Sequence, residues 1–482
     1  MKVNHLFLLV GIPSLFVSCT PKSSEKKTSG NPIFPGWYAD PEGIVFGDEY
    51  WIYPTLSLLY GEDEEIYKAD LERQTDAINP EYNLQTHMDA FSSKDLVNWT
   101  KHPRVLHIED VPWVKYALWA PSIIQANDKY YLFFGGNDIQ NNDQYGGIGV
   151  AVSDKPEGPF RLLSKYKYDL PDNLVEDGVF VDPGVLVDDD GRVYIYCGFE
   201  KSYMAELKSN MYEVISDSYI PDIIPADKES EKGFFEACSM RKVGDTYYLI
   251  YSPNKGNRLE YMTSDSPRGP FTYRGTIVDN GIDYPAGNNH GSICNINGQW
   301  YIFYHRMTNA TITSRRACVE KIEILPDGTI PQVEMTSLGF EDSLNPYKIT
   351  NADIACVLKG GCFITELDKF TRVITAIKTG AVIGYKYFDF GEDCSSKTME
   401  FAAKVNGSGC NSTIRILIDG EDGEEIGRCV IGAAGGTYTT VVKNVTGRHS
   451  VFFKIEHNYT GWFVDWYKER HLFELESFVF MK

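Results

Sequence analysis

Residues 235–252 read FEACSMRKVGDTYYLIYS, and this stretch shows the pattern from which the fold can be predicted. An acidic residue leads into an apolar strand, a tight turn and a second strand rich in aromatic residues. The same pattern recurs four times, in ADPEGIVFGDEYWIYPT (39–55), WAPSIIQANDKYYLFFGG (119–136), VDPGVLVDDDGRVYIYCG (181–198) and NHGSICNINGQWYIFYHR (289–306). Every turn carries Gly, Asp or Asn, the residues that hairpin turns favour.

The second strands of the five copies share an aromatic anchor, and the register of the copies is fixed around it. The anchors are Trp51, Tyr131, Tyr194, Tyr248 and Tyr301. A second element also repeats, as SDKPEGPF (153–160) and SDSPRGPF (264–271), with SSKDLVNW (92–99) as a variant. The repetition predicts an all-β, five-bladed β-propeller over residues 31–340. A β-sandwich is the alternative, but it would not explain the common register, and almost no segment has the periodicity of a helical solenoid.

Composition limits the classes of partner. The chain has 482 residues, of which 43% are hydrophobic, so large cores are possible. Lys and Arg number 46 against 67 Asp and Glu, and the net charge is −21. No basic block stands out beyond Lys26–Lys27, so we expect no nucleic-acid partner. A chain with this net negative charge suits a neutral ligand better than a polyanion.

Counting back from the anchors reveals a set of candidate site residues. Eleven or twelve residues before each anchor lie, in chain order, Asp40, Ala120, Asp182, Glu236 and His290. The first strand of each propeller blade lines the central axis, so residues at one register should converge at one mouth of the channel. The sequence therefore predicts that two Asp, one Glu and one His meet there.

Three facing carboxylates suit acid–base chemistry. Like charges resist joint ionisation, so one carboxyl can stay protonated as an acid while another acts as a base. Glycoside hydrolysis needs this division of labour. His290 could be a hydrogen-bonded channel histidine, a water anchor or a metal ligand, and one His cannot build a zinc site by itself.

At these residues the chain resembles glycoside hydrolase family 43. The ADP motif of Asp40 resembles the family's general-base motif, the VDP of Asp182 that of the pKa-modulating acid, and the FEA of Glu236 that of the general acid. The resemblance implies an inverting enzyme in which Asp40 activates water and Glu236 protonates the leaving oxygen. The two carboxyls are then expected about 6.5–9.5 Å apart.

Further motifs extend the resemblance. WAPS, with Trp119, resembles the motif beside the sugar subsite, and SRRACVEKIEILPDG resembles the segment whose first Arg, here Arg315, reaches the substrate. NHGS is similar to the motif of the family's axial His, which implies a calcium ion at His290, bound directly or through water. The related invertase-like families have RDP and EC motifs, which Val181 and Ala237 interrupt here.

The resemblance implies an exo-acting enzyme on oligo- or polysaccharide side chains. An α-L-arabinofuranosidase or a β-xylosidase is the default activity, and a β-D-galactofuranosidase is an alternative within the same class. The competing class is a non-catalytic, glycan-binding surface lipoprotein, against which the presence of all three carboxylates argues. We expect a monomer.

From residue 341 the rhythm changes, and residues 341–482 predict a β-sandwich of jelly-roll type. The runs GYKYFDFG (384–391), VTGRHSVFFK (445–454) and LFELESFVF (472–480) together resemble a family 6 carbohydrate-binding module. Glu474 stands where that module often has a sugar-contacting Asn, and Ser477 where it often has Trp. Tyr438 offers either a stacking face or a core aromatic ring.

The start of the chain predicts export. Residues 6–17 are apolar and too few to span a bilayer, which is typical of a signal peptide. FVSC, ending at Cys19, resembles a bacterial lipoprotein box. We therefore expect a signal peptide over 1–19, a lipid anchor on Cys19 and a polar tether over 20–30. The expected location is the cell envelope, at the outer membrane or in the periplasm. No C-x-x-C pair occurs among the ten cysteines, and a Cys356–Cys362 disulfide is left open.

Overall fold

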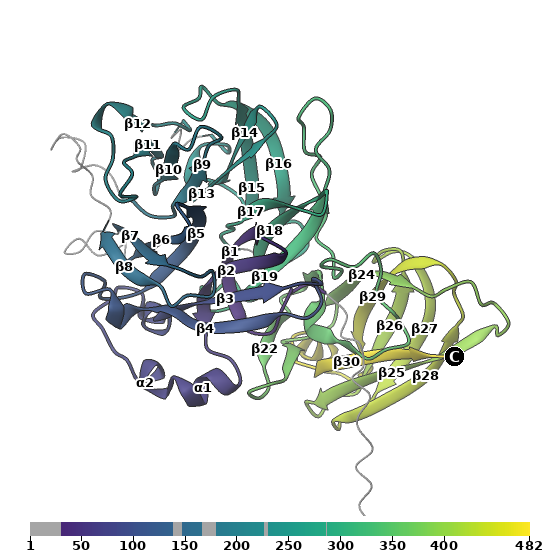
Figure 1. Cartoon of the computed structure of the whole chain (residues 1–482). Coiled ribbons are helices and arrows are strands. Elements are labelled where there is room, and N and C mark those ends of the chain that lie inside the picture. Colours follow the sequence, from purple (N-terminus) through teal and green to yellow (C-terminus); the bar gives the residue numbers. More distant parts are fainter. Residues whose placement is uncertain (1–29, 138–146, 166–179, 226–229, 286) are drawn as a thin grey trace, which may run out of the picture.

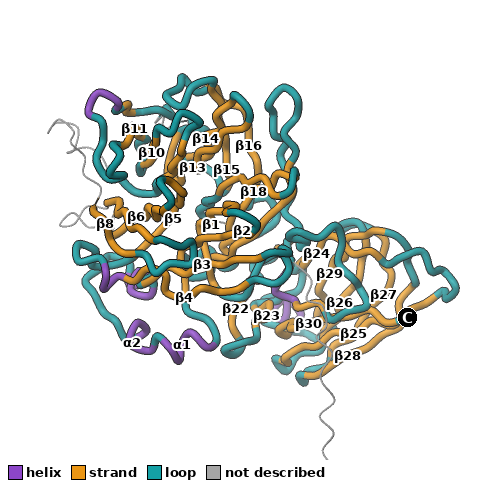
Figure 2. Tube along the Cα trace, viewed as in Figure 1, coloured by secondary structure: helices purple, strands orange, loops and turns teal. Residues whose placement is uncertain are grey.

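The computed structural model describes residues 30–137, 147–165, 180–225, 230–285 and 287–482. Within these residues the regular secondary structure is almost entirely β-strand, in a propeller-type domain followed by a β-sandwich (Figures 1 and 2). The expected signal peptide, Cys19 and all but the last residue of the expected tether lie outside the described residues.

Five antiparallel sheets of consecutive strands make up the first domain. The first sheet contains β1 (Trp37–Phe46), β2 (Glu49–Leu58), β3 (His87–Ser93) and β4 (Thr100–His107). The second contains β5 (Leu118–Ala126), β6 (Lys129–Gly136), β7 (Gly147–Ser153) and β8 (Arg161–Lys165). The third contains β9 (Gly184–Val187), β10 (Val193–Cys197), β11 (Tyr203–Leu207) and β12 (Ile220–Pro221).

The fourth sheet contains β13 (Phe234–Val243), β14 (Thr246–Pro253), β15 (Arg258–Ser264) and β16 (Thr272–Asp279). The fifth contains β17 (Ser292–Ile296), β18 (Gln299–Met307) and β19 (Arg315–Ile322). All five aromatic anchors lie on the second strand of their sheet, as the repeat predicts. The SDKPEGPF and SDSPRGPF segments both connect a third strand to a fourth.

The first strands of the five sheets contact one another in cyclic order. β1 contacts β5, β5 contacts β9, β9 contacts β13, β13 contacts β17, and β17 contacts β1 again. Separate apolar cores fill the spaces between neighbouring sheets. Pairs that share such a core are Trp51 with Leu132, Ile124 with Val185, Tyr196 with Leu249, and Ile52 with Phe303.

The N-terminal segment fastens the last sheet to the first. The amide nitrogen of the fully buried Asn31 donates to the Val319 carbonyl at 2.7 Å, and its amide oxygen accepts from the Val319 N–H at 2.8 Å. One step further along, the Ile33 N–H donates to the Ala317 carbonyl at 2.9 Å. The chain that leads into β1 therefore runs beside β19 and closes the ring.

The sandwich consists of two packed sheets. One contains β22 (Phe363–Glu366), β23 (Arg372–Thr375), β30 (Phe473–Met481), β25 (Thr398–Gly407) and β28 (Gly436–Lys443), with β20 (Thr350–Asn351) also on β30. The other contains β21 (Val357–Lys359), β24 (Val382–Asp389), β29 (Arg448–His457), β26 (Ser412–Ile418) and β27 (Glu424–Ile431). Tyr438, on β28, is half-buried, and its hydroxyl donates to the Ala434 carbonyl at 2.7 Å.

The two domains share one continuous core. A single cluster of buried side chains runs from the fourth and fifth propeller sheets into the sandwich. Trp37 of β1 belongs to it, and the Arg372 guanidinium of β23 lies 4.8 Å from the Trp37 ring centre. Beside it, Arg316 of β19 forms a buried ion pair with Asp353 at 3.0 Å. The sandwich is thus packed onto the propeller-type domain (Figure 1).

Helices are short and confined to connections. The segment between β2 and β3 contains α1 (Glu62–Ile66), α2 (Lys68–Leu71) and a 3₁₀ turn (Pro80–Leu84), and the sandwich contains α4 (Val464–Lys468). Further 3₁₀ turns are Ile108–Asp110, Ser216–Ser218 and Ala352–Ile354. Across the described residues, no helix is long and apolar enough to cross a bilayer. The nine cysteines of this part are all free, including Cys356 and Cys362.

Candidate active site

The first strands of three sheets, β1, β5 and β13, begin with β-bulges, and these set the direction of the site residues on them. Strand pairing slips between Ala39 and Glu42 in β1, and between Glu236 and Ser239 in β13. Asp40 and Ala237, inside these slips, have positive φ angles of 49° and 71°. A bulge bends its strand and re-aims a side chain, and a non-Gly residue with positive φ persists only where its surroundings hold it. Asp182, just before β9, has a φ of 52°.

Side chains of neighbouring sheets hold these strained residues in place. In three sheets the backbone N–H at the strained position donates to a side chain of the preceding sheet. The bonds run from Asp40 to His305 Nδ1 at 3.1 Å, from Ala120 to Thr55 Oγ1 at 2.6 Å, and from Ala237 to Asp182 Oδ2 at 3.1 Å. The geometry at the mouth of the ring is therefore set jointly by adjacent sheets.

Asp40 is buried and surrounded by cationic or polar groups. Arg315 Nη1 lies 3.2 Å from its Oδ1, and His305 Nδ1 lies 3.2 Å from the same oxygen. Burial alone would raise the pKa of Asp40, but the Arg315 guanidinium and the His305 contact outweigh it and hold that pKa well below its usual range. Asp40 is therefore an ionised carboxylate at any physiological pH.

The pKa values of Glu236 and Asp182 are shifted in the opposite direction, upward. Burial raises the pKa of Glu236 to about 7; a hydrogen bond from Asn288 Nδ2 at 3.2 Å opposes this shift, and the Asp40 charge adds to it. Burial, Glu236 and Asp40 raise the pKa of Asp182 as well, against the bond from the Ala237 N–H. The two carboxyls interact with each other, so near neutral pH this pair retains a proton.

Close approach of two backbones brings this pair together. A Cβ atom built on Gly184 would lie 2.5 Å from the Cys238 carbonyl oxygen. Only glycine allows the third and fourth sheets to come this near, two residues after Asp182 and two after Glu236.

His290 lies between the acids. Its Nδ1 is 3.7 Å from both Asp40 Oδ1 and Asp182 Oδ2, so it touches two of the three predicted carboxylates. Burial lowers the pKa of His290 to about 4, although Asp40 opposes this shift, so the ring is neutral at pH 7. No cluster of three His, Cys, Asp or Glu ligands includes His290 among the residues that the structure describes.

Trp119 lies at the edge of the same region, on β5. Its Nε1 donates to Gln85 Oε1 at 2.5 Å, and the Tyr82 ring meets its ring edge-on with centres 4.9 Å apart. Both partners belong to the segment between β2 and β3. That segment therefore fixes the orientation of Trp119.

The structure brings all six sequence-predicted residues to one end of the ring, and it adds four that the sequence reasoning missed. The six are Asp40, Trp119, Asp182, Glu236, His290 and Arg315, and the four are Thr55, Gln85, Asn288 and His305. Thr55 and His305 each stand four residues after an aromatic anchor, so counting forward as well as back would have found them. Gln85 lies in a non-repeating segment that gave no such signal.

Comparison with known proteins decides the family. The profile of glycosyl hydrolases family 43 matches residues 29–330. This chain belongs to that family. The profile of the family 6 carbohydrate-binding module matches residues 364–469, within the sandwich. The family 43 membership makes the chain a glycoside hydrolase, as the carboxylates predict.

Several characterised relatives of this family 43 chain are similar over most of their length. A xylosidase/arabinosidase of Thermoclostridium stercorarium is 34% identical over 421 residues, covering 76% of this chain and 84% of the relative. A β-D-galactofuranosidase of Aspergillus niger is 34% identical over 359 residues, covering 69% and 93%. The crystal structure of a family 43 arabinoxylan arabinofuranohydrolase from Bacillus subtilis, with cellotetraose, aligns with a TM-score of 0.50 at 25% identity, covering 94% of this chain and 97% of that one.

Proposed function

We propose that this glycoside hydrolase is an inverting, exo-acting enzyme that releases terminal α-L-arabinofuranosyl or β-D-xylosyl units from plant-type polysaccharide side chains. One observation carries the mechanism: two buried carboxyls at one site have opposite pKa shifts, with Asp40 held ionised and Glu236 raised to about 7. A base and an acid are then available at the same pH.

Four residues share the work of this mechanism. Asp40 accepts a proton from the attacking water, and Glu236 donates its proton to the leaving oxygen. The ionisation of Asp182 is coupled to that of Glu236, and its Oδ2 accepts the Ala237 N–H, which orients the backbone there. Arg315 keeps Asp40 charged, and its Nη2 is buried without a hydrogen-bond partner among the described residues, which leaves one donor for a sugar hydroxyl.

The relatives support the sugar assignment. The relative of T. stercorarium is named for xylosidase and arabinosidase activity, and the B. subtilis structure is that of an arabinofuranohydrolase. The β-D-galactofuranosidase of A. niger is equally similar in sequence identity, so a galactofuranosidase is the second candidate.

An aryl glycoside panel tests these proposals. Purified protein is assayed on 4-nitrophenyl α-L-arabinofuranoside, β-D-xyloside and β-D-galactofuranoside, with Asp40→Asn as the matched inactive control. We expect turnover of the first or second substrate that is lost in Asp40→Asn. Turnover of the third alone would favour the second candidate. Equal measurable rates for the wild type and Asp40→Asn would remove Asp40 from the role of base, and no turnover of any substrate by the wild type would point to a non-catalytic binding protein.

We also propose that the five sheets are the blades of one five-bladed propeller, over residues 31–340, and that the sandwich of residues 341–482 contacts saccharide. Tyr438 is half-buried, whereas Trp462 is fully exposed and Trp466 is 63% exposed. Exposed aromatic faces suit stacking against sugar rings. Weaker retention of a Trp462→Ala, Trp466→Ala variant on arabinoxylan in affinity electrophoresis would support this role.

Two further proposals concern calcium and location. One similar structure, that of a β-xylosidase/α-arabinofuranosidase from a compost metagenome in complex with xylotriose, is a calcium-free form. We propose that His290 helps retain a calcium ion whose other ligands are mainly waters, since no group of three metal-type ligands in the described residues includes His290. We propose that the protein is a lipoprotein of the cell envelope, anchored through Cys19. A Cys19→Ser variant should move from the membrane to the soluble fraction.

A further inference from the structure

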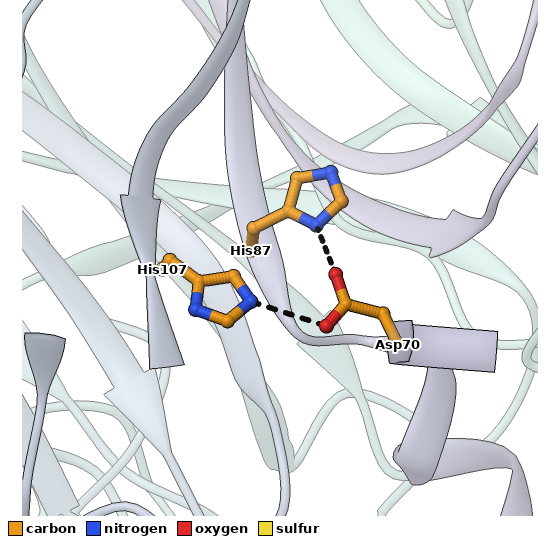
Figure 3. A group of neighbouring side chains, drawn as sticks. All are labelled: Asp70, His87 and His107. Atoms are coloured by element: carbon orange, nitrogen blue, oxygen red, sulfur yellow. Dashed lines mark hydrogen bonds and ion pairs between the residues drawn. The ribbon is translucent and has the colours of Figure 1, made fainter. Parts of the chain in front are cut away.

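A second group of ligand-type side chains lies away from the carboxylates, on the outer strands of the first sheet. Asp70 of α2, His87 of β3 and His107 of β4 meet there (Figure 3). Their ligand atoms all lie within 4.8 Å of one another. His87 and His107 are buried, and the Asp70 side chain retains 13% exposure.

The distances suit a shared ion better than a hydrogen-bonded triad. Asp70 directs one oxygen toward each ring, with Oδ1 3.3 Å from His107 Nε2 and Oδ2 3.9 Å from His87 Nδ1 (Figure 3). The longer distance is beyond hydrogen-bond range, and Asp70 Oδ2 is buried with no hydrogen-bond partner. Ligands at about 2.0–2.1 Å from a tetrahedral metal ion lie about 3.3 Å from each other. Small shifts of the His87 ring would bring the set to that spacing.

Both imidazoles also have a carboxylate behind their far nitrogen. Asp89 Oδ1 lies 3.6 Å from His87 Nε2, which is buried and without a hydrogen-bond partner, and Glu109 Oε2 lies 3.4 Å from His107 Nδ1. Metal-bound histidines commonly donate their second N–H to such a carboxylate, which fixes the tautomer and the ring orientation. Asp89 and Glu109 are not among the three ligand-type residues, and their positions also favour metal binding by the two histidines.

We propose that Asp70, His87 and His107 bind a divalent transition-metal ion, for which Zn²⁺ is the natural probe, with a fourth position left to water. Two imidazole nitrogens and one carboxylate oxygen are a donor set that Zn²⁺ accepts. Binding displaces the Thr86 hydroxyl, which lies 3.1 Å from His87 Nδ1. In the structure, His107 Nδ1 accepts the Glu109 N–H. Metal binding at Nε2 would move the ring proton to Nδ1, which would then donate to the Glu109 carboxylate.

The ion would tie the β2–β3 segment to its sheet. Asp70 comes from that segment, whereas His87 and His107 come from adjacent paired strands. The same segment supplies Gln85 and Tyr82, which contact Trp119. Metal binding at the edge of the first sheet would therefore steady one wall of the active site without contacting substrate.

Metal titration of the whole protein tests the site. Protein stripped with a chelator and supplied with excess Ca²⁺ is titrated with Zn²⁺ by calorimetry, and its melting temperature is measured with and without Zn²⁺. Asp70→Asn removes a ligand at nearly constant shape, and Asp76→Asn, an exposed acid of the same segment, is the matched control. Co²⁺ absorption in the visible range reports the coordination geometry.

We expect one Zn²⁺ per chain and a raised melting temperature in the wild type and in Asp76→Asn. Asp70→Asn should lose the thermal shift and the Co²⁺ band, and Glu109→Gln should weaken binding by about 10–100-fold. If Asp70→Asn does not fold, His107→Gln takes its place. Equal Zn²⁺ affinity in the wild type and the ligand variant, or no stoichiometric binding by the wild type, would overturn the proposal.

Discussion

The Arg315 guanidinium lies against the Asp40 carboxylate, with Nη1 3.2 Å from Oδ1 and 3.4 Å from Oδ2. The two residues are 275 positions apart and belong to the last and first sheets. Their contact keeps the proposed base charged inside a buried site, where an isolated carboxylate would tend to take up a proton.

Weakening this contact should change the acidic side of the pH profile. In Arg315→Lys the guanidinium whose Nη1 contacts both oxygens of Asp40 is lost, so the pKa of Asp40 rises. Since the base must be deprotonated, the rising limb of kcat/KM should move to higher pH. Arg316→Lys is the matched control, because Arg316 pairs with Asp353 instead. It should lower the melting temperature and leave the pH profile unchanged; an identical profile in Arg315→Lys would contradict the assignment.

The basic side of the profile should report on Glu236. With a pKa of about 7, the acid is protonated below pH 7, and kcat/KM should fall as the pH rises through that value. Asp182→Asn removes the carboxyl whose ionisation is coupled to that of Glu236. Glu236 then no longer titrates against a second negative charge, so its pKa falls and the descending limb moves to lower pH. Asp189→Asn, an exposed acid, should leave the limb in place. A limb that stays near pH 7 in Asp182→Asn would argue against charge coupling.

The leaving group separates the acid from the base. Glu236→Gln should reduce hydrolysis of natural oligosaccharides much more than that of aryl glycosides with acidic leaving groups, because a good leaving group needs little protonation. Asp40→Asn should reduce both alike, since no base remains. Rates on a series of substituted phenyl glycosides measure this. Equal losses for Glu236→Gln across the series would remove Glu236 from the acid role.

The shared core between the domains predicts joint unfolding. Trp37→Ala should destabilise the protein by about 3–5 kcal/mol, because a large side chain is removed from a packed site. The matched control is Trp462→Ala, whose side chain is fully exposed and whose loss should leave the melting temperature unchanged. Calorimetry should show one transition for both domains; two well-separated transitions would mean that the sandwich folds independently of the propeller-type domain.

Chelation tests the proposed calcium ion at His290. Removing Ca²⁺ should lower activity and melting temperature, and added Ca²⁺ should restore both. Asp70→Asn, which leaves this site intact, should respond to Ca²⁺ as the wild type does, whereas His290→Ala should not. If chelator has no effect while His290→Ala still lowers activity, His290 acts through hydrogen bonding alone.

Sequence reasoning placed the three acids together because the repeat keeps a nearly constant distance between the start of each first strand and the aromatic anchor. The same regularity gave His290, whereas Trp119 was inferred from the resemblance of its WAPS motif. The repeat could not predict Gln85, because Gln85 lies in a segment with no counterpart in the other sheets.

Contacts that depend on closure of the ring or on sheet pairing could not be predicted from the sequence either. Arg315 was expected at the substrate, but its pairing with Asp40 follows only from bringing β19 beside β1. In the sandwich, β28 and β29 are consecutive in the chain yet lie in different sheets, because β28 pairs with β25 and β29 with β24 and β26. Alternation of apolar residues marks a strand and does not choose its partner.

The contact between Asp40 and His305 lies on the seam where the first and last sheets meet, beside the bonds of Asn31 to β19. Local opening can occur at a lower free energy than global unfolding, and at this seam the ring is joined by segments from its two ends. Opening it by a fraction of an ångström would release the proposed base while every sheet remained folded. Activity would then be lost several degrees below the temperature at which circular dichroism records any loss of strand. The thermal inactivation of the enzyme would therefore measure the opening of this one seam.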